Sequence, residues 1–157
     1  MGDGWEPVDA EDPEFAALLV DSHLRVVGRP LVPGPPPGPE LARWLYRETP
    51  VALLAHRPGA DPRFCYANRA AQRHFGYDWA EFVGLPSRLS AADVDRAERA
   101  RLLSDVARDG FSDDYRGLRV AKSGSQFWIE NATVWNLVDA EGRLHGQAAA
   151  IRSVSPA

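Results

Sequence analysis

The residue types that carry most protein chemistry are sparse in this 157-residue chain. Cys65 is the single cysteine, which excludes an internal disulfide and a cysteine-based metal cluster. The sequence has no Ser, His and Asp in a hydrolase order, no spaced pair of metal ligands and no phosphate-binding loop. The adjacent acids Asp113 and Asp114 could support acid–base chemistry, although their place before a strand favours a turn.

Asn131 is a candidate binding residue because of its place in a strand-like run. Alternation along residues 126–138 puts one set of side chains on a common face: Phe127, Ile129, Asn131, Thr133 and Trp135. If that face is buried, the Asn131 amide needs a partner, since an unpaired buried amide costs about 1–3 kcal/mol. A backbone group, a water molecule or a ligand could be that partner.

Arg119 is the second candidate, and the strand pattern leaves its orientation open. Tyr115, Gly117 and Arg119 share one face of the run 115–122, and Leu118 and Val120 share the other. An inward guanidinium would suit a carboxylate or a phosphate. Without such a ligand, a nearby acid such as Glu130 or Asp114, or water, would have to compensate its charge.

Four other arginines are interpreted as surface residues and not as candidate ligand contacts. Arg88, Arg96, Arg99 and Arg101 alternate with acidic residues in and before a long helical segment, which indicates a solvated charged face.

These residues need strands and helices to position them. Three strand-like runs, 115–122, 126–138 and 145–152, are joined by short turns and are therefore expected to be antiparallel neighbours. Two shorter runs, 51–56 and 63–67, complete five strands. Apolar periodicity and capping residues predict the helices: residues 12–27, 40–48, 68–75, one turn from Asp78, and 91–109.

Composition divides the chain into three parts. Residues 1–11 are acidic and are expected to form a disordered tail. Residues 12–48 are expected to form an N-terminal helical extension that contains the Pro-rich connector 33–39. Residues 49–154 are then the core domain, and the whole is of the α+β class.

Charge and hydropathy limit the partners and the location. The formal net charge of −4 gives no support for binding nucleic acid. No apolar run approaches the roughly 20 residues of a membrane span, and the acidic N-terminus does not resemble a signal peptide. A cytoplasmic protein without nucleic-acid or membrane partners is the expectation.

Several short motifs, in this order, resemble those of PAS domains. They are Tyr66–Ala71, Phe75–Tyr77, Glu81–Gly84, Lys122–Trp128, Asp139–Gly142 and Gly146. Within the PAS-like families the chain more closely resembles the MEKHLA domain, which also occurs in plant class III homeodomain–leucine-zipper regulators and as short bacterial proteins. The closer pointers are Leu85–Ser90, Asp95–Arg99, Asp109–Tyr115 and Ile129–Asn136, and the likeness covers roughly residues 14–151.

The resemblance implies a five-stranded antiparallel sheet, order 2-1-5-4-3, with helices on one face and a ligand pocket between them. It turns the Asn131 face toward that pocket, and Arg119 matches a position that contacts flavin in light-sensing relatives. On the last strand either Gln147 or Ala148 faces inward. The candidate ligand-binding residues are therefore Tyr115, Arg119, Asn131 and Gln147, with Ser87 and Arg88 from the loop 85–89.

The resemblance also bears on cofactors and disfavours both common ones. Light-sensing flavin domains carry a Cys in a motif that matches Leu85–Leu89 here, where no Cys is present. Haem-binding relatives take an axial His from the long helix, and residues 91–109 contain none. No cofactor is expected, and His56, His74 and His145 are interpreted as edge or surface residues.

Many PAS proteins use an N-terminal helix to join two subunits across the outer sheet face. The apolar stripe from Phe15 to Val26 favours that arrangement here, with Trp128 and Val134 as apolar residues on the outer face, so a homodimer is expected.

Three functions remain open from the sequence. The first is a sensory domain that binds a small, anionic molecule and signals to a regulatory protein partner. The second is a dimerisation module with a filled core, and the third a small cofactor-free enzyme that uses the same pocket. A cavity lined by Arg119 and Asn131 would favour the first, and a paired titratable group with a perturbed pKa would favour the third.

Overall fold

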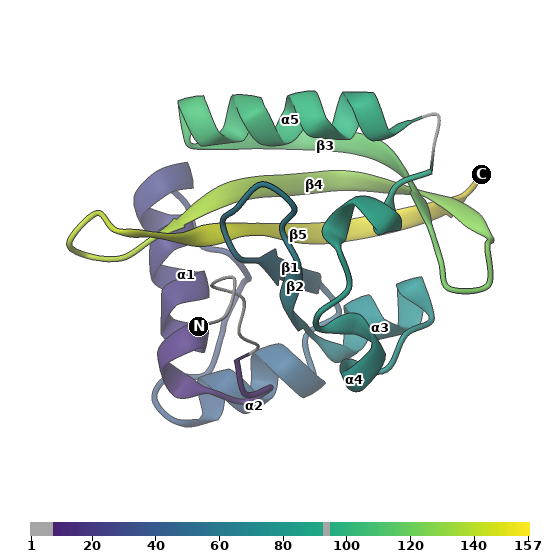
Figure 1. Cartoon of the computed structure of the whole chain (residues 1–157). Coiled ribbons are helices and arrows are strands. Elements are labelled where there is room, and N and C mark those ends of the chain that lie inside the picture. The colour runs from purple at the N-terminus through teal and green to yellow at the C-terminus, as the bar shows by residue number, and fades with distance from the viewer. Residues whose placement is uncertain (1–7, 93–94) are drawn as a thin grey trace, which may run out of the picture.

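The strand-like runs of the sequence form one antiparallel sheet (Figure 1). The computed structural model describes residues 8–92 and 95–157. The strands are β1 (Ala52–His56), β2 (Phe64–Ala67), β3 (Phe111–Val120), β4 (Gln126–Val138) and β5 (Leu144–Pro156). Their order, β2-β1-β5-β4-β3, is the predicted one, and β5 extends beyond the expected end at residue 152.

Helices surround the sheet, and α1, α3 and α4 begin at the predicted caps. They are α1 (Pro13–Val27), α2 (Glu40–Arg47), α3 (Arg69–Phe75), α4 (Trp79–Phe82), the 3-10 turn η1 (Ser87–Ser90) and α5 (Arg96–Asp109). Asp12 caps α1 through the Glu14 N–H, and Asp78 and Glu81 form a reciprocal capping box on α4. No helix of the described segments is long and apolar enough to cross a membrane.

The longest helix begins later than residue 91. It starts at Arg96, because Ala91 instead forms an antiparallel bridge with Arg119 of β3. Residues 93 and 94 of the predicted helix lie outside the described part of the chain.

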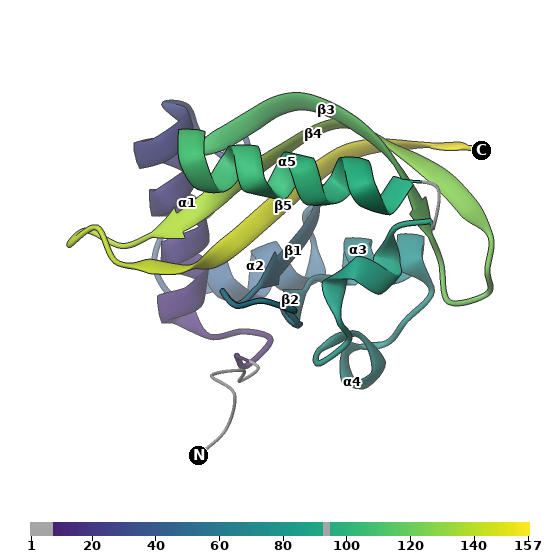
Figure 2. The same ribbon diagram turned by 45° about the horizontal axis from the view of Figure 1, so that its top comes forward.

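Each face of the sheet carries its own apolar core, because strand side chains alternate. On β1, for example, Leu53 packs with α1 and α2, and Leu54 packs with α3 and α5. Figures 1 and 2 show α5 along one side of the sheet and α1 crossing the other. The inner face, beneath α5, is the one that bears the cavity described below.

The buried indole of Trp135 links the outer face of the sheet to α1. Trp135 is fully buried, and its Nε1–H donates to the Ser22 hydroxyl of α1 at 3.0 Å. His23 packs edge-on against the same ring. The N-terminal helix therefore covers the outer sheet face of its own chain, and the expectation that it also joins two subunits stays a prediction.

Two residues in left-handed conformation overturn the predicted faces of β4. Asp114 and Asn131 have φ of 51° and 50°, and the β3–β4 register shifts on either side of Tyr115. A bulge at each point reverses the alternation, so Asn131 is exposed and Thr133 turns to the outer face. The prediction that Asn131 points inward was wrong for this reason.

The same reversal corrects the outer face. Val134, expected there beside Trp128, instead packs in the inner core with Leu54 and Leu102. Asn and Asp tolerate the left-handed region better than most residues do, which is the physical reason the bulges fall at these positions.

Two segments outside the core domain are tied to it by polar contacts. Arg29, at the start of the connector, pairs with Asp113 at 2.6 Å. Arg152 of β5 donates to Thr133 Oγ1 at 2.8 Å and to the Leu31 carbonyl at 3.3 Å. Residues 1–7 of the expected acidic tail lie outside the described residues, whereas the Val8 N–H reaches the Cys65 carbonyl on β2.

Both edge strands of the sheet are paired with loops. The Phe64 N–H of β2 donates to Leu85 O at 3.0 Å, and the Gly84 N–H donates to Phe64 O at 2.8 Å. On β3, the Leu118 N–H donates to the Asp95 carboxylate at 2.9 Å. Covered edges do not invite pairing with another chain, and here they also bring η1 and the start of α5 against the inner face.

Asn68 joins three elements through one buried side chain. Its Oδ1 accepts from the N–H groups of Leu53 and Ala71, each at 3.0 Å. Its Nδ2 donates to the carbonyls of Leu45 and Val51, each at 2.9 Å. Every hydrogen-bonding position of the amide is therefore used, which fixes α2, β1 and α3 relative to one another.

We predict that Asn68→Ala lowers the free energy of unfolding by about 3 kcal/mol or more, because it leaves buried backbone groups without partners. Urea denaturation followed by circular dichroism measures this change. Gln126→Ala, at an exposed amide, is the control and is expected to stay within about 0.5 kcal/mol of the parent. Equal stability of the two variants would contradict the role given to Asn68.

Candidate functional site

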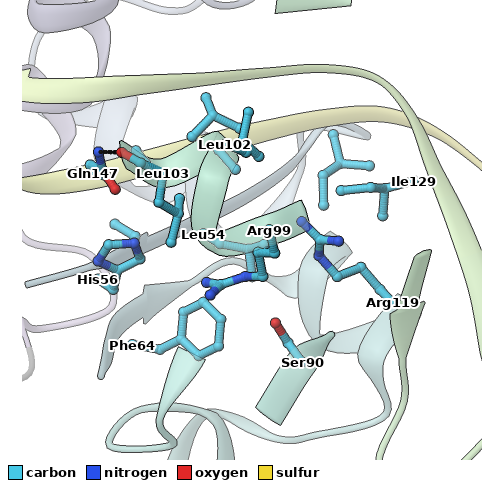
Figure 3. A pocket seen from close by; sticks show the side chains of 15 residues that line it. Leu54, His56, Phe64, Ser90, Arg99, Leu102, Leu103, Arg119, Ile129 and Gln147 are labelled. Atoms are coloured by element: carbon cyan, nitrogen blue, oxygen red, sulfur yellow. Dashed lines mark hydrogen bonds between the residues drawn. The ribbon is translucent and has the colours of Figure 1, made fainter. Parts of the chain in front are cut away.

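A cavity of about 40 Å³ lies between α5 and the inner face of the sheet (Figure 3). Apolar side chains from four strands and α5 form most of its wall, among them Leu54, Phe64 and Ile129. The polar residues that reach it are Ser90, His56, Arg99, Arg119 and Gln147. Such a small space would hold about three water molecules.

Arg119 enters the cavity from β3 and is only 6% exposed. Its Nη1 donates to Leu118 O at 2.9 Å, and its Nη2 lies 3.4 Å from the Tyr115 hydroxyl. Asp95 is the acid that faces it, with 3.6 Å between Nη1 and Oδ2. At that distance the contact is an ion pair rather than a hydrogen bond, and the Leu118 N–H holds the same carboxylate oxygen.

Gly117 leaves room for the side chains of Tyr115 and Arg119 to pack over its backbone. A Cβ at position 117 would overlap the Tyr115 hydroxyl and lie 2.8 Å from Arg119 Nη1. The absent side chain lets Tyr115 and Arg119 fold over the backbone between them. The predicted common face of Tyr115, Gly117 and Arg119 is thus the inner one.

Arg99 enters the same cavity from α5, and in Figure 3 it is drawn between His56 and Arg119. It is 8% exposed, and no hydrogen bond or ion pair holds its guanidinium within the described part of the chain. Burial, and then the positive charge of Arg119, lower the pKa of Arg99 to about 10. At neutral pH the group still carries its proton, so it is a buried cation without a counter-charge of its own.

His56 lies at the end of β1 beside Arg99. Its Nδ1 is 3.1 Å from the Arg57 carbonyl, which can only accept, so Nδ1 carries the proton. Its Nε2 is buried without a partner among the described residues. Burial lowers the pKa of His56 to about 4, and the Arg99 charge acts in the same direction.

Gln147, at this end of the cavity, and Ser87, at the neighbouring cleft, are further polar groups. Gln147 Nε2 donates to Leu103 O at 3.1 Å and to Asn136 Oδ1 at 3.2 Å. Ser87 is fully buried, and its hydroxyl lacks a partner within the described residues. The last strand therefore turns Gln147 inward and leaves Ala148 in the outer core.

A cleft of about 500 Å³ continues the cavity toward solvent. It lies between α5 and the β1–β2 loop, residues 57–62, and it shares a set of lining residues with the cavity: His56, Arg99, Leu103 and Gln147. Ser87 and Arg88 line the cleft, where Arg88 is exposed and pairs with Asp61 at 3.0 Å. A space of this size suits a small organic molecule.

The structure brings together most of the candidate residues and separates one. Arg119 and Gln147 line the cavity, and Tyr115 contacts Arg119 there. Ser87 and Arg88 lie at the cleft. Asn131 lies outside both, because the bulge in β4 exposes it.

Sequence reasoning missed Arg99 and His56. Arg99 was assigned to a solvated face, but it shares the buried side of α5 with Leu102 and Val106. That spacing of three and seven residues places it on the apolar stripe, which could have identified it. His56 was taken for an edge residue, although it has the same strand parity as the inward Leu54.

The part of the chain that the structure describes holds no group of three metal-ligating side chains. Nor does a hydrogen bond link His56 to a serine hydroxyl among the described residues, as a base paired with a nucleophile would require. What the site offers is positive charge in a small apolar space.

The low pKa of His56 makes stability depend on pH. Between pH 6.5 and about 4 the unfolded chain binds a proton at this residue and the folded chain does not. The unfolding free energy should therefore fall as pH is lowered through that window, by about 2–3 kcal/mol between pH 7 and pH 4.5 from this group alone.

Urea denaturation at the two pH values, for the parent and for His56→Gln, isolates this contribution from that of other titrating groups. The variant should lose less stability than the parent on acidification. The same loss in both proteins would show that His56 does not stay neutral in the fold.

Comparisons with known proteins agree with this fold. The family model of the MEKHLA domain matches residues 13–156. A search of curated proteins finds no match. Among solved structures, the PAS domain of a protein from Colwellia psychrerythraea superposes with a TM-score of 0.64 at 16% identity, covering 73% of this chain and 93% of that one.

Two light-oxygen-voltage structures are also similar. An RNA-binding light-oxygen-voltage receptor has a TM-score of 0.61 at 23% identity, over 76% of this chain and 36% of that one. A light-oxygen-voltage domain studied with a flavin analogue has a TM-score of 0.52 at 22% identity, over 64% and 74%. At sequence identities of 16–23%, the similarity to these solved structures shows a shared fold and nothing more.

Proposed function

We propose a sensory, ligand-binding role for this chain, which belongs to the MEKHLA domain family. In this proposal a small anionic molecule occupies the cavity beneath α5, and its binding is passed on through contact with a protein partner. The fold alone does not decide this, because one fold serves many functions. The argument rests on the cavity itself.

The observation that carries the proposal is the unpaired Arg99 guanidinium. An ion moved out of water loses several kcal/mol of solvation unless other charges or hydrogen bonds replace the water. Arg119 has Tyr115, Leu118 and Asp95 near it, whereas Arg99 has no such partner in the described structure. A bound anion would compensate the charge of Arg99.

The cavity and its cleft also weigh against a dimerisation module with a filled core. A cleft that shares His56, Arg99 and Gln147 with the cavity beneath α5 offers space to a ligand and adds nothing to packing. Elsewhere the core is compact, with Phe75, Phe82 and Trp135 fully buried. Large side chains therefore fill the interior away from the cavity.

We predict that small carboxylates or phosphates raise the melting temperature of the parent protein in a thermal-shift screen. Arg99→Met keeps the length of the side chain and removes its charge, so the response to the anion should be lost. Arg101→Met, at an exposed arginine two positions further along α5, is the matched control and should respond as the parent does.

Two results would count against the proposal. The first is a parent protein whose melting temperature no anion of the panel changes. The second is an Arg99→Met variant that responds as strongly as the parent and the Arg101→Met control.

We also propose that the ligand is neither haem nor flavin. The loop 85–89 lacks a cysteine, and Cys65 is buried on β2, where burial raises the pKa of its thiol to about 11. Such a thiol is poorly suited to photochemical attack on a flavin.

Purified protein should therefore be colourless, and an ultraviolet–visible spectrum measures this. Stoichiometric absorbance near the usual haem or flavin bands, about 400 or 450 nm, would contradict the expectation. That expectation follows from the absence of a cysteine in residues 85–89 and of a histidine in residues 91–109.

A further inference from the structure

We infer that the ligand is a monocarboxylate with an apolar body, whose head lies at Arg99 and whose body lies in the cleft beside α5. This inference rests on the proposed anion-binding role and adds to it the class of anion. Three features of the site support it: the size of the cavity, the shape of the cationic groups and the character of the cleft.

The cavity limits the size of the head group. Its volume of about 40 Å³ has room for about three water molecules. A planar carboxylate of three heavy atoms fits within that space, and a tetrahedral phosphate or sulfate group of five heavy atoms would fill it more tightly. The close-packed wall of Leu54, Phe64 and Ile129 resists expansion, because cores with few voids yield little.

The cations suit a planar head. A guanidinium presents a flat fork of N–H groups that pairs with both oxygens of a carboxylate. Arg119 is already engaged by Leu118 O and the Tyr115 hydroxyl. Arg99 therefore makes the main contact, and the charge of Arg119 adds to the attraction, although Asp95, at 3.6 Å, and Glu98 offset part of that charge.

The cleft is suited to an uncharged body. Its α5 wall carries Ala100, Leu103 and Ala107, and Leu144, 51% exposed, stands across from them. At the rim the charge of Arg88 is matched by Asp61. The third arginine of the cleft, besides Arg88 and Arg99, is Arg57 in the β1–β2 loop, so the α5 wall beyond Arg99 carries no charge.

The cavity and the cleft lie next to each other in the order that this ligand needs, with the cleft on the solvent side. Arg99 lines both the cavity and the cleft, together with Leu103. A molecule that enters from solvent would therefore meet the apolar wall first and place its head at the buried cation last. The cleft volume of about 500 Å³ lies within the range for ligands of this kind.

Isothermal titration calorimetry with a matched series of probes tests the inference on the full chain. Octanoate should bind, and acetate should bind at least about tenfold more weakly because it lacks a body to bury. Octanol should bind at least about tenfold more weakly than octanoate because it lacks the charge, and octyl phosphate likewise because of its larger head.

A variant of the cleft gives a second, independent readout. Ala107→Trp fills the apolar wall and should weaken octanoate at least about tenfold while changing acetate less than about threefold. Ala97→Trp, exposed on the same helix and not part of the cleft, is the control and should bind both probes as the parent does.

The outcomes separate this inference from the proposed function. If acetate or phosphate binds as tightly as octanoate, the apolar body is wrong and the anion site stands. If octanol binds as tightly as octanoate, or if Ala107→Trp leaves octanoate binding unchanged, the inference is overturned. If no anion binds the parent protein, both proposals fail together.

Discussion

Arg99 and Arg119 bring two guanidinium groups under α5, and in the described structure Glu98 acts on Arg119 while Asp95 is the carboxylate that pairs with it. That carboxylate is itself held by the Leu118 N–H and lies at ion-pair distance from Arg119 alone. The Arg99 guanidinium therefore lies in a small space with mostly apolar walls and has no carboxylate at ion-pair distance among the described residues. Such a charge destabilises the free protein unless something neutralises it.

The rest of the fold holds this arrangement in place. Asn68 holds α2, β1 and α3 together, and β1 is the strand that carries His56. The loop pairing at β3 brings Asp95 and the start of α5 against Arg119. Gly117 allows Tyr115 and Arg119 to bend together, so each of these features contributes to one cationic cavity.

Much of the fold could be predicted from the sequence because its cues are local. Caps such as Asp12 and Asp78, the turns between the long strands, and the apolar runs decide where elements begin and end. The motifs that resemble the MEKHLA domain then supplied the strand order, which the structure confirms. These cues do not depend on contacts between distant parts of the chain.

The site was harder to predict because it depends on strand parity and on burial. Simple alternation placed Asn131 inside, and the bulges at Asp114 and Asn131 reverse it. Arg99 was assigned to solvent because its neighbours are charged, although its helical position is on the apolar stripe. The bulges leave no clear mark in one sequence, whereas the burial of Arg99 is indicated by its spacing from Leu102 and Val106.

The central claim is that an anion compensates the charge of Arg99. A high-resolution crystal structure of the protein as purified tests it most directly. The account predicts non-protein density within hydrogen-bonding distance of the Arg99 guanidinium, in the cavity that also holds Arg119. An Arg99 side chain turned out into bulk water, with the space beneath α5 closed by apolar side chains, would contradict it.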